Sequence, residues 1–257
     1  MSEYNTVKYG TDGSVAIVTI FRPDAMNAFN AELRSELAAA LKEAADDASI
    51  RAVVLTAEGR SFSAGADLKE INVDIEEVLQ KQYRPIFEQI IGMEKPVIAA
   101  VGGSAAGIGM SIALACDLLV MGDNAFLLSP FTTISLVPDG GLNWSLVHQL
   151  GYRRAFQLSI ESERIPADRC VELGLANKAV PADSLLDEAV GWAKALAERA
   201  PLSLAATKKA MRAAASGSWA DTFDIEAPLQ QTLRHSDDCK EGVTAFFEKR
   251  KPDFKGK

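Results

Sequence analysis

Two turns rich in glycine and alanine could hold a negatively charged oxygen on backbone N–H groups. Residues 61–70 read SFSAGADLKE, and residues 100–117 read AVGGSAAGIGMSIALACD. Each turn follows an apolar run typical of a β-strand, and the second leads directly into a helical sequence. Small residues let the backbone approach a ligand closely, and unpaired amides at a helix start attract negative charge. We therefore expect an oxyanion hole with two backbone donors, one from each turn.

The elements that must position these turns alternate between strands and helices. The sequence predicts strands over residues 15–21, 52–56, 97–101 and 117–121, and helices over residues 75–93 and 108–115. A further helix begins near Asn30, because Leu33, Leu37 and Leu41 share one of its faces. We interpret residues 22–24 as a turn and residues 59–65 as a loop. This order indicates an α/β fold with parallel sheets flanked by helices.

Beyond residue 142 the sequence predicts helices and no further strands. The helical segments are residues 142–150, 154–160, 167–173, 185–200 and 204–215. We therefore divide the chain into a core, residues 1–196, and a helical C-terminal region, residues 197–257.

The composition excludes several classes of function. The chain has 257 residues and a net charge of −8, without a long basic block, so nucleic acid and anionic membrane surfaces are not expected partners. A secretory signal and an uncharged stretch of membrane-spanning length are both missing, which makes a cytoplasmic protein the expectation. Cys116, Cys170 and Cys239 are too far apart to suggest a disulfide framework or a metal site.

Other catalytic motifs are incomplete. Gly107 and Gly109 begin a dinucleotide-binding fingerprint, but Ile112 stands where its third glycine belongs. Ser63 and Ser104 lack the flanking glycines of a nucleophile elbow. These patterns do not favour NAD binding or serine hydrolysis.

Five strings in order make the chain resemble the crotonase superfamily of acyl-CoA hydratases and isomerases over nearly its full length. They are Arg22-Pro23 with Met26-Asn27-Ala28, residues 61–70, residues 100–117, residues 136–141 (LVPDGG) and residues 240–254 (KEGVTAFFEKRKPDF). The resemblance implies a spiral of ββα repeats, an acyl-CoA thioester substrate and no cofactor or metal. It also implies that the C-terminal helices form a homotrimer or a dimer of trimers.

The resemblance also implies roles for individual residues. It places the two oxyanion donors on the amides of Ala66 and Ile108. Further substrate contacts carried over by position are Ala25, Met26, Ala64, Asp67, Leu68, Lys69, Gly109, Phe131, Phe246 and Lys249. Phe246 and Lys249 match positions that reach the nucleotide of a neighbouring subunit in related trimers. Alternatively, the basic residues 249–251 form a solvated helix end.

One departure from the hydratase pattern favours an isomerase. Similar hydratases carry two glutamates where this chain has Ser111 and Phe131. Adding water to a double bond needs acid and base groups that neither side chain provides. A hydratase that uses an unrecognised acid, and a catalytically silent CoA-binding protein, remain alternatives.

Asp139 is the candidate acid and base. Its position resembles that of the acidic residue in 3,2-enoyl-CoA isomerases and in ring-1,2-epoxyphenylacetyl-CoA isomerase. We expect Phe131 and Leu128 to line an apolar pocket that raises its pKa, and residues 75–87 to contribute pocket walls. Alternatively, Asp139 caps the helix that begins near Leu142. A similar dehalogenase would need a histidine between the two turns, but His148 and His235 lie outside that interval.

Overall fold

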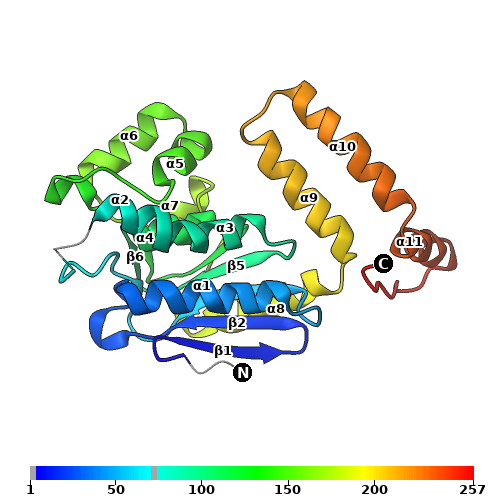
Figure 1. The fold of residues 1–257 in the computed structure, drawn as a ribbon, viewed down its shortest axis with the longest axis horizontal. Helices are drawn as coiled ribbons and strands as arrows, with labels where there is room; N and C mark the ends of the chain where they lie inside the picture. The colour runs from blue at the N-terminus through cyan, green and yellow to red at the C-terminus, as the bar shows by residue number, and fades with distance from the viewer. Residues whose placement is uncertain (1–3, 71–73) are drawn as a thin grey trace.

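The computed structural model describes residues 4–70 and 74–257, which form two β-sheets surrounded by helices (Figure 1). The larger sheet has the strand order β1-β2-β3-β5-β7-β10, and only the β1–β2 pair is antiparallel. Its strands are β1 (Val7–Asp12), β2 (Val15–Ile20), β3 (Ala52–Ala57), β5 (Val97–Val101), β7 (Leu118–Gly122) and β10 (Lys178–Val180). The predicted α/β class with parallel strands is confirmed.

A second, smaller sheet has the order β4-β6-β8-β9, with an antiparallel pair only between β8 and β9. Its strands are β4 (Ser61–Ser63), β6 (Ser104–Ala106), β8 (Phe126–Leu128) and β9 (Ile165–Pro166). Three successive chain segments each give one strand to the larger sheet, one strand to the smaller sheet and then a helix. This is the ββα spiral that the resemblance implied.

Strand β3 explains how one sheet supports two cores. Val53 and Leu55 belong to the larger apolar core, while Ala52 and Val54 belong to the smaller one, as the two-residue period of a strand requires. Helix α8 (Leu185–Ala197) covers the smaller core. Because both faces are covered, the strand is a continuous apolar run rather than an alternating one.

Helix α1 (Ala31–Asp46) begins where the sequence predicts. The side-chain oxygen of Asn30 accepts a hydrogen bond from the Leu33 amide and caps the first turn. Leu33, Leu37 and Leu41 are fully buried against the larger sheet.

The helix predicted over residues 75–93 is interrupted. It consists of α2 (Ile75–Val78), a π-helical segment η2 (Leu79–Tyr83) and α3 (Arg84–Gly92). Pro85 lies in the first turn of α3 and has no amide hydrogen to continue the α-helical bonding. Such π-helical turns are frequent at functional sites.

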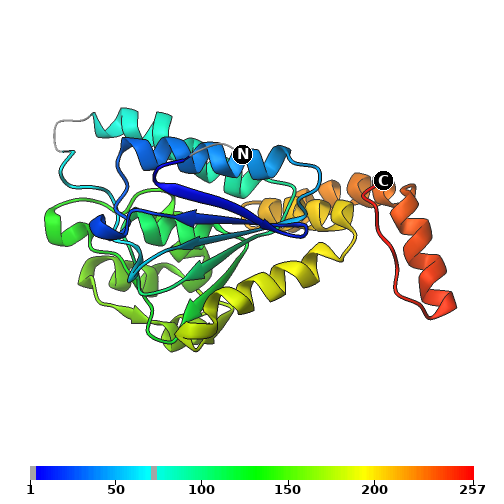
Figure 2. The same cartoon turned by 90° about the horizontal axis from the view of Figure 1, so that it is seen from below.

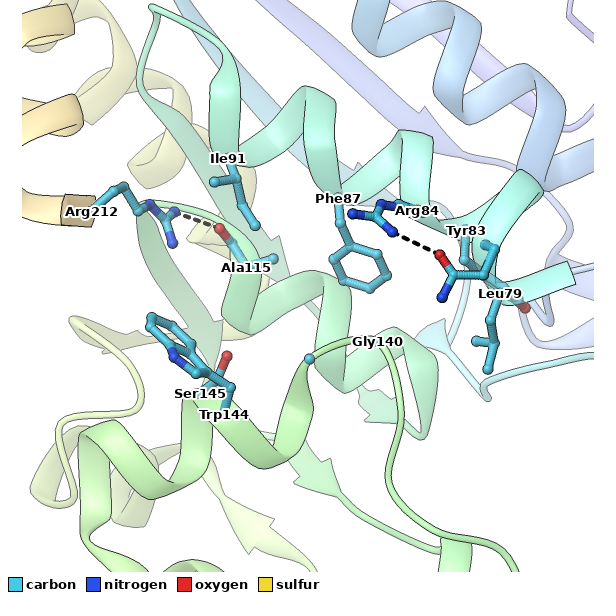
Figure 3. A pocket seen from close by; sticks show the side chains of 12 residues that line it. Leu79, Tyr83, Arg84, Phe87, Ile91, Ala115, Gly140, Trp144, Ser145 and Arg212 are labelled. Carbon is cyan, nitrogen blue, oxygen red and sulfur yellow. Dashed lines mark hydrogen bonds between the residues drawn. The ribbon is translucent and has the colours of Figure 1, made fainter. Parts of the chain in front are cut away.

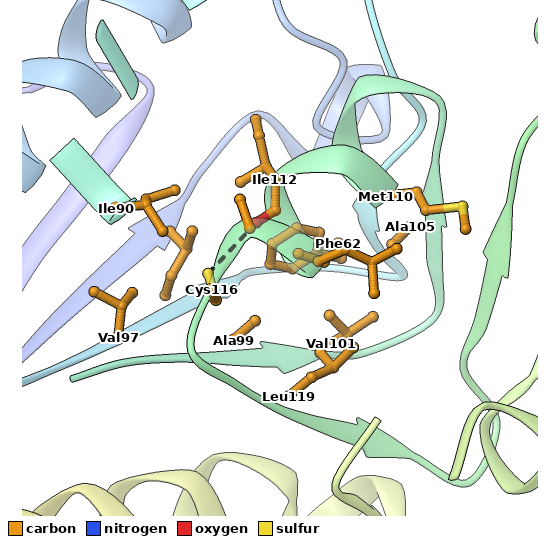
Figure 4. Packing of buried hydrophobic residues seen from close by; sticks show 14 of the residues in the cluster. Phe62, Ile90, Val97, Ala99, Val101, Ala105, Met110, Ile112, Cys116 and Leu119 are labelled. Carbon is orange, nitrogen blue, oxygen red and sulfur yellow. Dashed lines mark hydrogen bonds between the residues drawn. The ribbon is translucent and has the colours of Figure 1, made fainter. Parts of the chain in front are cut away.

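Helix α4 (Ile108–Ala115) passes through the centre of the molecule, and all eight of its residues are buried. Figure 4 shows Cys116, directly after α4, beside Val97 and Ala99 of β5, and Met110 and Ile112 of α4 belong to the same apolar cluster. Because α4 is buried on every side, packing fixes the positions of both its ends. The site described below uses Ile108 at one end and Ala115 at the other.

The prediction of no strands after residue 142 is wrong, because β9 and β10 lie in this part of the chain. With two and three residues, these strands are too short to show a sequence period. The loop predicted over residues 59–65 likewise contains β4, and β1, β6 and β8 were not predicted.

The remaining helices are α5 (Leu142–Leu150), α6 (Tyr152–Glu161), α7 (Ala167–Glu172), α9 (Pro201–Ala214), α10 (Trp219–Arg234) and α11 (Asp237–Glu248). Short 3-10 turns are η1 (Pro23–Ala25), η3 (Phe131–Ile134) and η4 (Ala182–Ser184).

Helices α9, α10 and α11 extend away from the two sheets (Figures 1 and 2). The boundary expected between residues 196 and 197 falls at the last turn of α8. Large apolar side chains on this extension are exposed in the single chain, among them Trp219, Phe246 and Phe247.

Candidate active site

The two glycine-rich turns lie against each other. Gly65 and Gly107 both have a positive φ, +105° and +55°, respectively. A side-chain carbon placed on Gly65 would be only 3.2 Å from the Ala106 carbonyl oxygen, and one on Gly107 would be 3.6 Å from the Gly65 Cα. Glycine at both positions therefore allows the two backbones to meet.

Each turn presents a backbone amide without a partner. The amides of Phe29 and Asp67 form hydrogen bonds on either side of Ala66, at 2.8 Å to Gly65 O and 3.0 Å to Phe29 O. The Ala66 N–H itself, and that of Ile108 at the start of α4, donate to no group in the described part of the chain. Free amides at a helix start favour a negative charge. Two donors from adjoining turns can hold one anionic oxygen.

Asp139 lies next to this arrangement because its neighbour Gly140 packs directly on α4. A Cβ on Gly140 would be 2.5 Å from Ile108 Cδ1 and 2.9 Å from Ser111 Cβ. The Ser111 hydroxyl also donates to the Asp139 carbonyl oxygen at 2.9 Å. The loop that carries the carboxyl group is thus fixed to the helix that carries one of the free amides.

The Asp139 carboxyl group is set up to exchange a proton. Its Oδ1 is buried and has no hydrogen-bond partner among the residues described. Burial raises the pKa of Asp139 from an ordinary 3.8 to about 6, because the charged form loses solvation. Helix α5 is preceded by Gly141 and has no side-chain cap, so the alternative that Asp139 caps this helix is wrong. Only its carbonyl oxygen accepts from the Leu142 amide, at 3.1 Å.

A cavity of 560 Å³ opens beside Gly140, between the π-helical segment with α3 on one side and α5 on the other (Figure 3). Its walls are mostly apolar and aromatic. The lining residues are Leu79, Gln80, Tyr83, Arg84, Phe87, Ile91, Ala115, Gly140, Gly141, Trp144, Ser145 and Arg212. The expectation that residues 75–87 contribute walls is confirmed.

Phe131 and Leu128 do not line this cavity, so the expected apolar pocket is built from other residues. Phe131 is buried beside the second turn, with Cζ 3.8 Å from a Cβ placed on Gly107. Leu128 lies in β8, and its carbonyl oxygen accepts from the Gly107 amide at 3.0 Å. Both residues therefore contact the second turn at Gly107.

The residues expected to contact substrate near the first turn are held close to it. The amide of Ala64 donates to Met26 O at 3.0 Å, which joins the loop of Ala25 and Met26 to this turn. Asp67 pairs with Arg22 at 3.3 Å, so its carboxylate braces the same loop. The side chains of Leu68 and Lys69 are exposed at its rim.

Three other expected contact residues are placed differently. Gly109 packs on Ser63, where an added Cβ would be 2.6 Å from Ser63 Cβ, so it sets the distance between α4 and β4. Phe246 and Lys249 lie at the end of α11, on the side of the molecule opposite α2 (Figure 1). Within one chain they are not brought to the site.

The other titratable groups singled out by sequence lie outside the cavity. His148 and His235 are exposed, and the Nδ1 atom of each lies 2.8 Å from a carbonyl oxygen four residues earlier. Burial raises the pKa of Cys116 to about 12. Within residues 4–70 and 74–257, no cluster of three or more histidine, cysteine or acidic side chains is arranged to hold a metal ion. Within the same ranges, every helix is too short or too polar to span a membrane.

Sequence reasoning missed the far wall of the cavity. Trp144 comes from α5 and Arg212 from α9, and neither belongs to a motif. Tyr83 had no individual signal either, although its buried hydroxyl lacks a partner among the described residues. Only the folding of distant segments brings these side chains together.

Comparisons with known proteins show the family of this chain. Residues 10–257 match the family described as enoyl-CoA hydratase/isomerase. A probable enoyl-CoA hydratase of Rhodobacter capsulatus is 39% identical, with 99% of both chains covered. The 1,2-epoxyphenylacetyl-CoA isomerase of Escherichia coli is 34% identical over 95% of each chain. The crystal structure of an enoyl-CoA hydratase from Polaromonas sp. JS666 has a TM-score of 0.91 and 36% identity, covering 96% of this chain and 99% of the other. The chain therefore belongs to the enoyl-CoA hydratase/isomerase family.

Proposed function

We propose that this chain is an enoyl-CoA isomerase, which moves a double bond of an acyl-CoA thioester into conjugation with the thioester carbonyl. One observation carries the proposal. Asp139, whose carboxyl group has an unpartnered oxygen and a raised pKa, lies on the loop that packs against α4, the helix that begins with the free Ile108 amide. An isomerase needs one group that takes a proton and gives it back, and Asp139 can do both.

In the proposed reaction, the amides of Ala66 and Ile108 hold the thioester oxygen. The Asp139 carboxylate removes a proton from the carbon next to the carbonyl of a 3-enoyl thioester, and the electrons move onto the held oxygen. The protonated Asp139 then returns the proton two carbons further along, which leaves a 2-enoyl thioester. Each oxyanion donor contributes about 2.7–4 kcal/mol to such a transition state. The reaction is redox-neutral and calls for no cofactor besides the CoA of the substrate.

Hydration is a second candidate, because several relatives are named as hydratases. Water addition requires groups that orient the water and exchange its protons. Ser111 already donates its hydroxyl hydrogen to the Asp139 carbonyl, and Phe131 has no acidic group. These positions support proton transfer by Asp139 alone.

Recognition of the CoA portion belongs to the same proposal. We assign it to the loop of Ala25 and Met26 and to the exposed Lys69, whose ammonium suits phosphate groups. We also propose a homotrimer or a dimer of trimers, in which Phe246 and Lys249 reach a neighbouring subunit's nucleotide. Light scattering that gives a monomer would contradict this assembly.

The test is the conversion of a 3-enoyl-CoA, followed by the new ultraviolet absorbance of the conjugated product. We expect turnover by the wild type and a loss of about a thousandfold in Asp139→Asn, with binding of a saturated acyl-CoA retained. Asp183→Asn, which alters an exposed acid, is the matched control. Equal rates for wild type and Asp139→Asn would overturn the proposal. Loss of absorbance from a 2-enoyl-CoA at a comparable rate would favour a hydratase. Binding of acyl-CoA without any turnover would favour a catalytically silent CoA-binding protein.

A further inference from the structure

The side chains that line the cavity carry more positive than negative charge. Its lining includes two guanidinium groups, Arg84 and Arg212, and no carboxylate. Arg212 lies at one end of the cavity with Ile91 and Trp144, while Tyr83 and Leu79 lie at the other end (Figure 3). Gly140 lies between them, so a chain that enters beside Asp139 can run along Phe87 toward Arg212.

Arg84 has an acid of its own. Its Nε donates to Glu88 at 2.8 Å, and its Nη1 donates to Gln80 at 2.8 Å, both on the same helical face. The pair is well exposed to solvent. The charge of Arg84 is therefore matched without a ligand.

Arg212 shares its acid with a second cation. Its Nη2 donates to Asp117 at 2.9 Å and to the Ala115 carbonyl oxygen at 2.7 Å. Lys208 contacts the other oxygen of Asp117 at 2.7 Å. One carboxylate is thus shared by two cations, so these three groups together carry a positive charge.

The donors that remain free belong to Arg212. Lys208 also donates to the carbonyl oxygens of Ile90 and Lys95, at 2.8 and 3.2 Å, so its three hydrogens are used. Nε and Nη1 of Arg212 donate to no group that the structure describes. A largely buried guanidinium with spare donors matches a carboxylate, whose two oxygens fit its planar fork.

We propose that the acyl group taken by this chain ends in a carboxylate that binds Arg212. The inference rests on the proposed function, because that function places the thioester at Ala66 and Ile108. The apolar walls formed by Phe87, Ile91 and Trp144 then hold the methylene or aromatic middle of the acyl group. A neutral chain of the same length would cover the guanidinium without supplying a partner, which is unfavourable.

The test uses saturated acyl-CoA thioesters of increasing chain length, each paired with the thioester of equal length that ends in a carboxylate. Binding is measured by calorimetry and therefore needs no turnover. At the best length, the wild type should bind the carboxylate-ended thioester about tenfold to a hundredfold more tightly than its neutral counterpart. Arg212→Gln should lose this preference, Arg212→Lys should keep part of it, and Lys209→Gln, an exposed charge on the same helix, should keep all of it.

Equal or tighter binding of the neutral thioesters by the wild type would overturn the inference, and so would a preference that survives in Arg212→Gln. Because Arg212 also joins α9 to the end of α4, circular dichroism must show that the glutamine variant folds. If it does not fold, the wild-type preference and the Arg212→Lys result decide. A protein with the expected preference that does not isomerise 3-enoyl thioesters would overturn the proposed function alone. Isomerisation without the preference would overturn this inference alone.

Discussion

The buried polar groups at the two ends of helix α4 differ in their partners. Among the described residues, those at the N-terminal end have none, and the carboxylate at the C-terminal end is paired. At the N-terminal end, the Ile108 amide and the Asp139 Oδ1 have no partner among the described residues. At the C-terminal end, Asp117 accepts from the Val97 amide at 2.9 Å and pairs with Lys208 and Arg212. The same helix therefore holds one carboxylate ready for proton transfer and uses another as a structural anchor.

This contrast indicates which end of α4 can take part in proton transfer. The Asp117 carboxylate, which pairs with Lys208 and Arg212, joins α9 to the sheet. A carboxyl group that is buried without a cation stays close to proton exchange at neutral pH. Such a group costs stability, and enzymes retain it because it serves catalysis.

The largest expected effect follows from a substitution of Asp117, at the C-terminal end of α4. Asp117→Ala leaves Lys208 and Arg212 facing each other without their shared acid, and all three side chains are largely buried. We expect the free energy of unfolding to fall by about 3 kcal/mol, measured by chemical denaturation. Asp183→Ala, in an exposed turn, is the control. A change as small as that of the control would remove the distinction between the two ends.

The next effect, on catalysis, follows from a substitution of Gly140, near the N-terminal end of α4. Gly140→Ala puts a Cβ 2.5 Å from Ile108 Cδ1 and 2.7 Å from Phe87 Cζ, which must displace the loop of Asp139. A shift of about 1 Å lowers catalysis about a hundredfold, so we expect kcat/KM to fall by that factor. Gly141→Ala is the matched control, because its φ is also positive, +79°, but nothing lies within 4 Å of the added carbon. Equal losses in both variants would show that backbone strain, not packing, governs the loop.

A smaller effect of opposite sign is expected for the stability of Asp139→Asn. Because folding raises the pKa of Asp139 from 3.8 to about 6, its stabilising contribution is complete below the unfolded value and is lost as the pH rises through about 6. At pH 7 the wild type therefore carries a penalty that the asparagine variant lacks. After allowance for partial solvent exposure, we expect the variant to be about 1–2 kcal/mol more stable.

Thermal or chemical unfolding at two pH values measures this difference. The advantage of Asp139→Asn should shrink toward zero when the pH is lowered below 3.8. A variant that is less stable than the wild type at pH 7 would indicate that the carboxylate has a structural partner.

The sequence predicts the parts of the fold that long patterns encode. Helix α1 follows from its leucine spacing and the Asn30 cap, and β3 follows from an apolar run that is covered on both faces. The three-residue strands β4, β6 and β8 were missed because they are too short for any period. Their partners in the small sheet are set by the spiral, which a single segment does not reveal.

The site likewise has parts that the sequence predicts and parts that it does not. The turns at Gly65 and Gly107 carry small residues that only a close backbone approach explains, so they could be recognised from the sequence. Trp144 and Arg212 could not, because their meeting depends on how α5 and α9 pack around α4. Phe131 lies against the turn at Gly107 and does not line this cavity, a placement that its position in the sequence does not reveal.

The pH dependence of kcat/KM for isomerisation tests the central role of Asp139 most directly. The free enzyme must carry the carboxylate to remove a proton, so kcat/KM should rise about tenfold per pH unit at low pH and level off above about 6. The residual activity of Asp139→Asn should lack this inflection. A wild-type profile without an inflection near pH 6, or the same inflection in the asparagine variant, would show that Asp139 is not the group that removes the proton.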